Sequence, residues 1–286
     1  LITDSAAGAT AFACGVKTFN NAIGIGKDTL PVYSILEESE DHGLSTGLIA
    51  TSTIVHATPA AFIAHQPMRT MYEEIAADFL NTEIDFFLGG GKEYFDNRNT
   101  DKRDLVKELE KKNYIVLSDY TGFVPKKFNP EKNLAFFTAS KHPTTASGGR
   151  NYLPFAAGLA IDFLEHHGDK GFFLMIEGSQ IDWGGHSNDK QMLIKELEDF
   201  DRMVKRVLEY AQRKGDTLVI VTADHGTGGF AIQPGSKFGN IKAEFTTNGH
   251  TASLVPVFAY GPGANLFSGI YENTAIHAKM RQALGF

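Results

Sequence analysis

Residues 172–186, FFLMIEGSQIDWGGH, place three polar side chains directly after an apolar run. The run 172–176 predicts a buried strand, and Glu177, Asp182 and His186 follow it. Open α/β sheets present ligand-binding groups at this end of their parallel strands. Asp182 and His186 are four residues apart, so one helical turn would place them on the same face. Mixed imidazole and carboxylate ligands suit zinc, whereas an all-oxygen set suits magnesium. The plain alternative is a charged loop after a strand.

Two further apolar runs are flanked by the same kinds of side chain. The run 218–221 is followed by Asp224 and His225, and His250 precedes the run 255–260. A single histidine is usually only a surface residue. Three histidines beside strand ends, two of them with a nearby aspartate, favour a metal centre.

The spacing of these side chains allows two zinc ions. One would be held by Asp182, His186 and His250, and the other by Asp224 and His225. Spacing alone does not determine this division of the ligands.

The composition is that of a globular protein, with 42% hydrophobic and 21% charged residues. The 286 residues suffice for one large α/β domain or two small ones. A net charge of −7 argues against nucleic acid as the main partner. No apolar stretch approaches ~20 residues, so no membrane span is predicted. Cys14 is the single cysteine, which excludes an internal disulfide and a thiolate zinc cluster, and its apolar neighbours predict a buried thiol.

Strand-like runs alternate with helical patterns along the chain. The predicted strands are 46–51, 84–88, 114–117, 134–137, 172–176, 218–221 and 255–260. The predicted helices are 32–42, 71–82, 104–113, 154–167, 191–214 and 274–284. This alternation predicts an α/β fold, a three-layer sandwich with a central mostly parallel sheet flanked by helices. Polar stretches predict surface loops at 97–104, 118–132 and 139–150. The run 89–91 is predicted to be a strand-to-loop turn, because it lacks the lysine and hydroxyl of a phosphate loop.

Small residues from Asp4 to Ala11 predict a helix with Ser5 in its first turn. Backbone N–H groups and the helix dipole favour an anion there. The plain alternative is an N-cap, since Asp or Ser commonly begins a helix. A nearby metal can deprotonate a serine hydroxyl and make it a nucleophile. No base triad is recognisable around Ser5, so metal activation is the simpler mechanism.

Further along, Thr58 lies in the segment HATPA and Arg69 follows it. Thr58 can offer a hydroxyl to a hard cation. Arg69 can offer the bidentate fork that matches a phosphate. Taken singly, a turn at Thr58-Pro59 and a solvated Arg69 are the plainer interpretations.

Five motifs, DSAAGATAFACGVKT, HATPAAFIAHQPMR, IEGSQIDWGGH, TADHGTGG and GHT, occur in this order. As a set they closely resemble the alkaline phosphatase family, from about Asp4 to the C-terminus. The resemblance implies hydrolysis of phosphate monoesters, with Ser5 as the nucleophile that becomes phosphoserine. It also implies that Asp4 orients Arg69 and that Arg69 binds the phosphate oxygens.

The resemblance also implies two Zn²⁺ and one Mg²⁺. It assigns Asp182, His186 and His250 to one zinc, Asp224 and His225 to the zinc that activates Ser5, and Thr58 and Glu177 to the magnesium. Two zinc ions about 4 Å apart can clamp the attacking and leaving oxygens of an in-line displacement. The remaining catalysis is positioning and charge neutralisation by Arg69. An alkaline optimum follows if Ser5 and a zinc-bound water must both be deprotonated.

The chain departs from the family pattern at two points. The family has an aspartate on a first strand, upstream of the serine motif, that bridges the second zinc and the third metal. We therefore expect 1–286 to be a single catalytic domain that lacks its N-terminal strand segment, as a fragment or with the segment cleaved and still associated. His56 and Trp183 occupy positions that vary within the family. His56 stands where an aspartate would help hold magnesium, which puts the third metal in question, and Trp183 is expected to pack or to form a wall of the phosphate pocket.

The expected substrates are small phosphomonoesters, with inorganic phosphate as a ligand. A homodimer and a periplasmic or extracellular location are implied by the resemblance only. The short segment 230–248 suggests a compact member of the family. One alternative is a phosphodiesterase or related phosphoryl-transfer enzyme, although Arg69 favours monoesters because it neutralises the extra charge of a terminal phosphate. The other alternative is an inactive zinc- or phosphate-binding protein.

Overall fold

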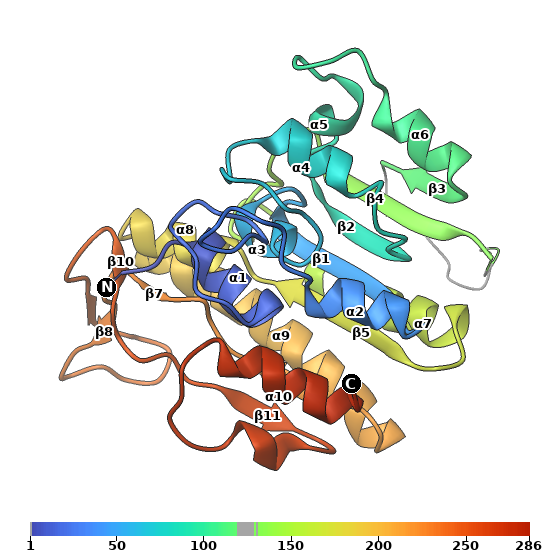
Figure 1. The fold of residues 1–286 in the computed structure, drawn as a ribbon. Helices are drawn as coiled ribbons and strands as arrows, with labels where there is room; N and C mark the ends of the chain where they lie inside the picture. The colour runs from blue at the N-terminus through green and yellow to red at the C-terminus, as the bar shows by residue number, and fades with distance from the viewer. Residues whose placement is uncertain (1, 119–128, 130) are drawn as a thin grey trace.

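The centre of the molecule is a five-stranded parallel sheet. The structure is a computed structural model that describes residues 2–118, 129 and 131–286. The strands are β1 (Ser45–Thr53), β2 (Phe86–Gly90), β3 (Tyr114–Leu117), β4 (Asn133–Ala139) and β5 (Phe172–Glu177). They lie in the order β3-β4-β2-β1-β5, and every neighbouring pair is parallel (Figure 1). This confirms the predicted sheet, whereas the predicted loop 118–132 lies mostly outside the described residues.

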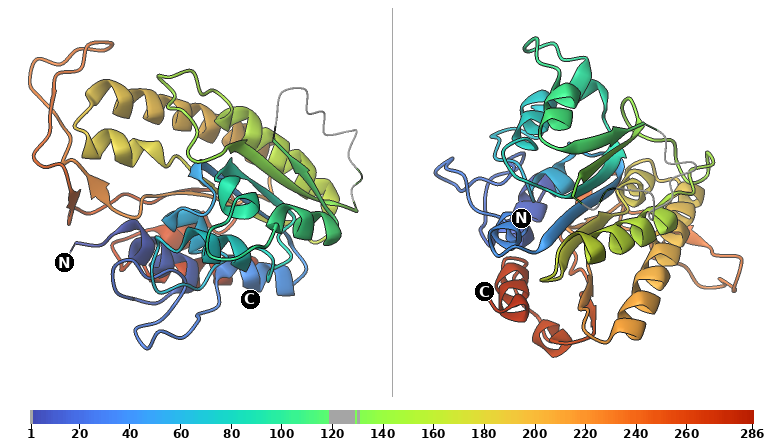
Figure 2. Two further views of the ribbon diagram at one scale, coloured as in Figure 1. Left: turned by 90° about the horizontal axis from the view of Figure 1, so that it is seen from above. Right: turned by 90° about the vertical axis from the view of Figure 1, so that its right-hand side faces the viewer.

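Helices lie against both faces of this sheet. They are α1 (Ser5–Cys14), α2 (Ile35–Asp41), α3 (Ala57–Ala60), α4 (Tyr72–Asp78), α5 (Glu93–Asp96), α6 (Leu105–Lys111), α7 (Leu153–His167), α8 (Gln180–His186), α9 (Lys190–Lys214) and α10 (Ala275–Leu284). α7 and α9 lie on one side of the sheet, and α1, α2 and α10 lie on the other (Figure 2). The predicted three-layer α/β sandwich is therefore confirmed.

Adjacent phenylalanines of each strand contribute to different layers of the core. Phe86 and Phe136 are buried in the apolar cluster beneath α7. Phe87 and Phe137 are buried in the cluster on the opposite face, with residues of α4 and α6. Successive side chains of a strand point to opposite faces. A continuous apolar run is thus what a strand covered on both sides requires.

Capping side chains set where the helices begin. α2 starts at Ile35, later than predicted, because Ser34 and Glu37 form a capping box in which each side chain accepts a hydrogen bond from the other's backbone N–H. α6 starts after Asp104, whose side chain accepts a hydrogen bond from the backbone N–H of Lys107.

The short helices α3 and α5 were not predicted, and the helical turn considered for 182–186 is present as part of α8. In the described parts of the chain, no helix is long and apolar enough to cross a membrane.

The strands that follow β5 do not join the five-stranded sheet. β6 (Val219–Val221) pairs with β11 (Phe258–Tyr260) in antiparallel orientation. Shorter pairs are β7 (Gly226–Thr227) with β10 (His250–Thr251) and β8 (Ala231–Ile232) with β9 (Ala243–Glu244). A 3₁₀ helix, η2 (Ala264–Phe267), precedes α10. The predicted strands 218–221 and 255–260 therefore exist, but among the described residues they form a separate pair.

Two local predictions are wrong. β5 was predicted to be buried, yet all six of its residues are partly exposed, whereas all nine residues of β1 are buried. The reason is that, among the residues the structure describes, the outer edge of β5 faces a cavity instead of another strand. Gly89 and Gly90 belong to β2, and only Gly91, with φ of +97°, lies in the turn. A Cβ at Gly90 would lie 2.0 Å from the carbonyl oxygen of Lys141, so a close backbone approach explains this glycine.

Candidate active site

The polar side chains singled out in the sequence meet at the carboxyl ends of β1, β5 and β6. β1 leads into α3 with Thr58, β5 ends at Glu177 and leads into α8, and β6 is followed by Asp224. α1 and α8 lie at this same end of the sheet (Figure 1). This is the edge at which parallel strands present ligand-binding groups.

Asp4 connects the start of α1 with Arg69. Its Oδ1 accepts a hydrogen bond from the backbone N–H of Ala7 at 3.0 Å, so Asp4 is the N-cap of α1. Its Oδ2 accepts from Nη1 of Arg69 at 3.2 Å and from the backbone N–H of Asn21 at 3.0 Å. The capping residue therefore also holds the arginine, and the two interpretations of this motif are compatible.

α1 has small side chains because it is buried on all sides. All ten of its residues are buried, and burial raises the pKa of the Cys14 thiol far above its usual range, as expected for an inert cysteine. A Cβ at Gly8 would lie 3.2 Å from Cβ of Asp224, so glycine allows α1 to approach the segment after β6. This approach brings Ser5 next to His225.

Two side chains converge on one imidazole nitrogen at the start of α1. Nε2 of His225 lies 3.0 Å from Oγ of Ser5 and 3.0 Å from Oδ2 of Asp224. In a serine–histidine–aspartate triad the aspartate would contact the other ring nitrogen. Here Nδ1 lies 3.2 Å from Oγ1 of Thr227 instead. A hydroxyl, a carboxylate and an imidazole placed this close together suit a bound cation better than they suit a triad.

Asp182, His186 and His250 form a second group of ligand atoms. One atom from each lies within 4.8 Å of the other two, and the Nε2 atoms of the two histidines are 3.1 Å apart. Nδ1 of His186 lies 2.7 Å from the carbonyl oxygen of Asn248, and Nδ1 of His250 lies 2.8 Å from that of Thr3. Donation from Nδ1–H to these carbonyls leaves both Nε2 lone pairs directed at each other, which suits a shared metal ion. The chemistry of this donor set fits zinc.

Glu177 and Thr58 form a third polar group. Burial raises the pKa of the Glu177 carboxyl to about 7, and the neighbouring Asp224 carboxylate adds to this effect, while hydrogen bonds with Ser179 and Thr58 oppose it. Oγ of Ser179 donates to Oε2 of Glu177 at 2.5 Å. A cation between such oxygens would relieve the repulsion, so these side chains fit a hard divalent ion.

An aromatic wall lies beside Arg69. Nη2 of Arg69 is 3.4 Å from Nε2 of His56. The ring of Trp183 lies 6.1 Å from that of His56, centroid to centroid, in an edge-to-face arrangement. Burial lowers the pKa of His56 to about 3, and the Arg69 charge adds to this effect. His56 is therefore a neutral side chain in this wall.

Sequence reasoning missed His142 and Thr227. The exposed His142 ring lies 4.8 Å from Trp183, and its Nδ1 accepts from the backbone N–H of Thr53 at 3.1 Å. No motif marks His142, because it belongs to a polar stretch predicted as a surface loop. Oγ1 of Thr227 donates to Oδ1 of Asp182 at 2.5 Å. Thr227 lies within the TADHGTGG motif, so the motif itself was the available signal.

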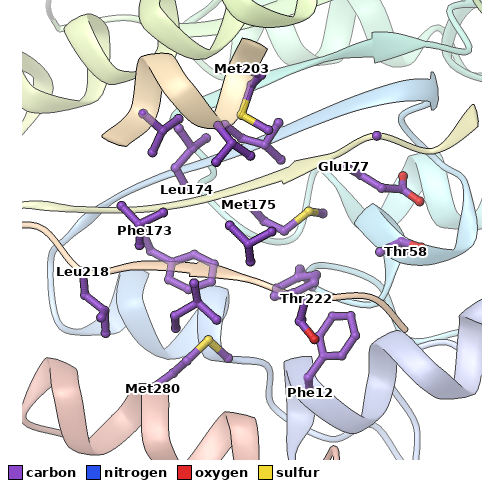
Figure 3. A pocket seen from close by; sticks show the side chains of 18 of the residues that line it. Phe12, Thr58, Phe173, Leu174, Met175, Glu177, Met203, Leu218, Thr222 and Met280 are labelled. Atoms are coloured by element: carbon purple, nitrogen blue, oxygen red, sulfur yellow. The ribbon is translucent and has the colours of Figure 1, made fainter. Parts of the chain in front are cut away.

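A cavity of about 990 Å³ begins at this site and extends between β5 and β6 (Figure 3). Glu177 and Thr58 lie at its polar end, and the side chains along the rest of it are mostly apolar (Figure 3). Its polar lining also includes Ser5, His56, Asp182, Asp224 and His225. Only one end of the cavity therefore belongs to the candidate active site.

Comparison with known proteins agrees with this geometry. The alkaline phosphatase family profile matches residues 1–244 and 240–286. The chain belongs to the alkaline phosphatase family. Alkaline phosphatase 4 of Bacillus subtilis is 34% identical over 96% of this chain and 74% of its own length. Membership confirms the predicted family and its class of activity, phosphomonoester hydrolysis.

Solved alkaline phosphatases share the fold. The enzyme from the Antarctic bacterium TAB5 superimposes with a TM-score of 0.94 and 43% identity, over 99% of this chain and 85% of that enzyme. A variant of the TAB5 enzyme with Mg bound superimposes with a TM-score of 0.93, over 100% of this chain and 85% of the variant. The α/β fold described above is thus that of an alkaline phosphatase.

Proposed function

We propose that this alkaline phosphatase hydrolyses small phosphomonoesters through a phosphoserine intermediate on Ser5. The observation that carries the proposal is the position of the Ser5 hydroxyl. It lies at the first residue of α1 and 3.0 Å from Nε2 of His225, where the two groups of candidate zinc ligands meet. The N–H groups at a helix start favour the phosphate that Ser5 would carry.

Arg69 has the position and chemistry of a phosphate clamp. Asp4 holds one side of its guanidinium at 3.2 Å, and His56 lies 3.4 Å from another of its nitrogens. A guanidinium fixed in this way can offer paired N–H donors to two phosphate oxygens. Arg69 would neutralise the extra negative charge that a terminal phosphate carries, and this favours monoesters over diesters.

The donor sets fit two zinc ions and one magnesium ion. Asp182, His186 and His250 would hold one zinc, Asp224 and His225 the other, and Thr58 and Glu177 the magnesium. Bound zinc would supply Lewis acid stabilisation of the attacking and leaving oxygens. The Mg bound in the TAB5 variant supports a third metal position. His56, which stands where an aspartate would help hold magnesium, is neutral and adds no negative charge to that position.

Further properties of the whole protein belong to the same proposal. We infer that residues 1–286 form one catalytic domain, that the protein is a homodimer and that it acts in the periplasm or outside the cell. A related phosphodiesterase is the second candidate, because the same dizinc chemistry can cleave diesters. A third possibility is a protein that binds zinc and phosphate without turnover.

The experiment measures zinc content and phosphate release on the same sample at alkaline pH. We expect two zinc ions per chain and faster release from an aryl monoester than from an aryl diester. Ser5→Ala should lower turnover by about 10³-fold or more while zinc content is kept, since the nucleophile is lost and the ligands remain. Ser147→Ala, on an exposed loop, is the control. Faster diester cleavage, or Ser5→Ala with wild-type turnover, would contradict the proposal.

A further inference from the structure

Three hydrogen bonds around Arg69 form a closed ring that joins three segments of the chain. Nη1 of Arg69 donates to Oδ2 of Asp4 at 3.2 Å, and the backbone N–H of Asn21 donates to the same oxygen at 3.0 Å. The ring closes where the backbone N–H of Arg69 donates to the carbonyl oxygen of Asn21 at 2.8 Å. Arg69 is therefore held at both ends, its guanidinium by Asp4 and its backbone by Asn21.

The residues that follow Asn21 fix the course of the chain that carries Arg69. Ile23 and Gln66 form an antiparallel bridge in which each backbone N–H donates to the other's carbonyl oxygen at 2.9 Å. A Cβ at Gly24, which has φ of +56°, would lie 2.1 Å from a backbone carbonyl oxygen of the second segment, so the two segments touch at their backbones. Arg69 itself lies in a turn between α3 and α4, outside any helix or strand. Its position therefore depends on these contacts.

Asn21 has a backbone conformation that few side chains accept. Its φ is +74°, in the left-handed region, which asparagine adopts more readily than most residues and a β-branched residue adopts only under strain. No hydrogen bond between its side chain and another described residue is present. Asn21 thus acts through its backbone, whose N–H is directed at Asp4 and whose carbonyl oxygen is directed at the N–H of Arg69.

We propose that Asn21 is a positioning residue for Arg69, and that its left-handed backbone sets the direction in which the guanidinium meets phosphate. The inference rests on the proposed function, in which Arg69 binds phosphate. A bidentate contact needs two N–H donors aligned with two phosphate oxygens, so a shift of the Arg69 backbone weakens it more than it would weaken a simple charge attraction. The serine motif ends at Thr18, so Asn21 lies outside the residues that the motif marks.

The test is the dissociation constant of inorganic phosphate, measured by isothermal titration calorimetry on the zinc-loaded protein. We expect Asn21→Val to raise this constant about 10-fold, because valine would push the backbone out of the left-handed region and move Arg69 with it. Asn21→Gly, which accepts a positive φ without strain, should bind phosphate within about twofold of the wild type. Wild-type affinity in Asn21→Val, or an equal loss in both variants, would overturn the proposal.

Asn113→Val supplies a matched control. Asn113 also has a positive φ, +73°, but it precedes β3 at the amino end of the sheet, whereas the candidate site lies at the carboxyl ends of the strands. We expect both valine variants to lower the melting temperature and only Asn21→Val to weaken phosphate binding. Equal weakening by Asn113→Val would overturn the proposal, because a general loss of stability would then explain the effect.

A double variant separates this inference from the proposed function. In Arg69→Ala, which lacks the guanidinium, the addition of Asn21→Val should change the phosphate affinity no further. If Arg69→Ala alone binds phosphate like the wild type, the clamp in the proposed function is wrong, and this inference fails with it. If Arg69→Ala weakens binding and the addition of Asn21→Val weakens it again by the same factor as in the wild type, the clamp stands and only the positioning role of Asn21 is wrong.

Discussion

Thr227 lies between the two groups of candidate zinc ligands. Its hydroxyl donates to Oδ1 of Asp182 at 2.5 Å and lies 3.2 Å from Nδ1 of His225. Contacts of this kind orient metal ligands, and their loss typically costs 10- to 100-fold in affinity. We expect Thr227→Val to weaken zinc binding about 10-fold, measured by competition with a chromogenic chelator. Thr227→Ser, which keeps the hydroxyl, should bind zinc like the wild type. Equal affinity of all three proteins would contradict this role.

We expect the shape of the Arg69 side chain to matter more to phosphate binding than its charge does. Lysine keeps the positive charge but not the planar fork, and it cannot replace a bidentate contact to phosphate. We expect Arg69→Lys to raise the inhibition constant of inorganic phosphate about 10-fold or more. The control is Arg103→Lys, at an arginine that pairs with Glu108 on the surface. If both variants are inhibited like the wild type, Arg69 does not clamp phosphate.

At the scale of elements, the sequence predicts which segments form strands and helices better than it predicts where they end. Apolar runs and helical periodicity predict the five parallel strands, because each is covered on both faces. Boundaries depend on single side chains, as when Ser34 and Glu37 delay the start of α2. α3 and α5 are only four residues long, too short for a periodic pattern to be recognised.

His65 connects α2 with the segment after α3. Its Nε2 lies 2.9 Å from Oε1 of Glu37, and its Nδ1 lies 2.7 Å from the carbonyl oxygen of Gly24. Burial alone would lower the pKa of His65, but these two hydrogen bonds raise it above the ordinary value. The protonated form is therefore stabilised by folding. Its contribution is complete below about pH 6.5, the ordinary pKa, and is lost as the pH rises through the higher pKa of the folded protein.

We accordingly expect His65→Gln to reduce the free energy of unfolding by about 1–2 kcal/mol at pH 5.5 and by clearly less at pH 9. Urea unfolding at the two pH values measures the difference. His166→Gln, on the exposed side of α7, should cost little at either pH. A loss for His65→Gln that is the same at both pH values would show that packing, and not the charged hydrogen bonds, makes the contribution.

For the whole molecule, the sequence predicts which residues belong to the candidate site but not how the strands pair. The motifs identify Ser5, Arg69 and the acidic and histidine residues, because their order along the chain is specific. They do not reveal His142, since a histidine in a polar loop has no distinguishing pattern. The partial exposure of β5 could not be predicted either, because an apolar run predicts a strand but not which strands lie beside it. The burial of β5 depends on pairing with segments that are distant in the sequence.

Candidate metal ligands come from segments far apart in the chain, and this links metal binding to the stability of the whole molecule. His186 in α8 and His250 in β10 are 64 residues apart, yet their Nε2 atoms lie 3.1 Å from each other. A cation held by both binds the folded state and not the unfolded one. At a free concentration of 100 times its dissociation constant, it would stabilise the fold by about 2.7 kcal/mol.

We expect a chelator to abolish phosphate release and to lower the melting temperature by about 5–10 °C. Zinc should restore both properties, and magnesium alone should restore neither, because the imidazole-containing site suits zinc. Asp182→Ala provides the control, since it removes one ligand of the group formed by His186 and His250. Its melting temperature should already be low and should respond less to the chelator than that of the wild type. If the wild type keeps its melting temperature and its activity in chelator, Asp182, His186 and His250 do not hold a metal ion that supports either stability or activity.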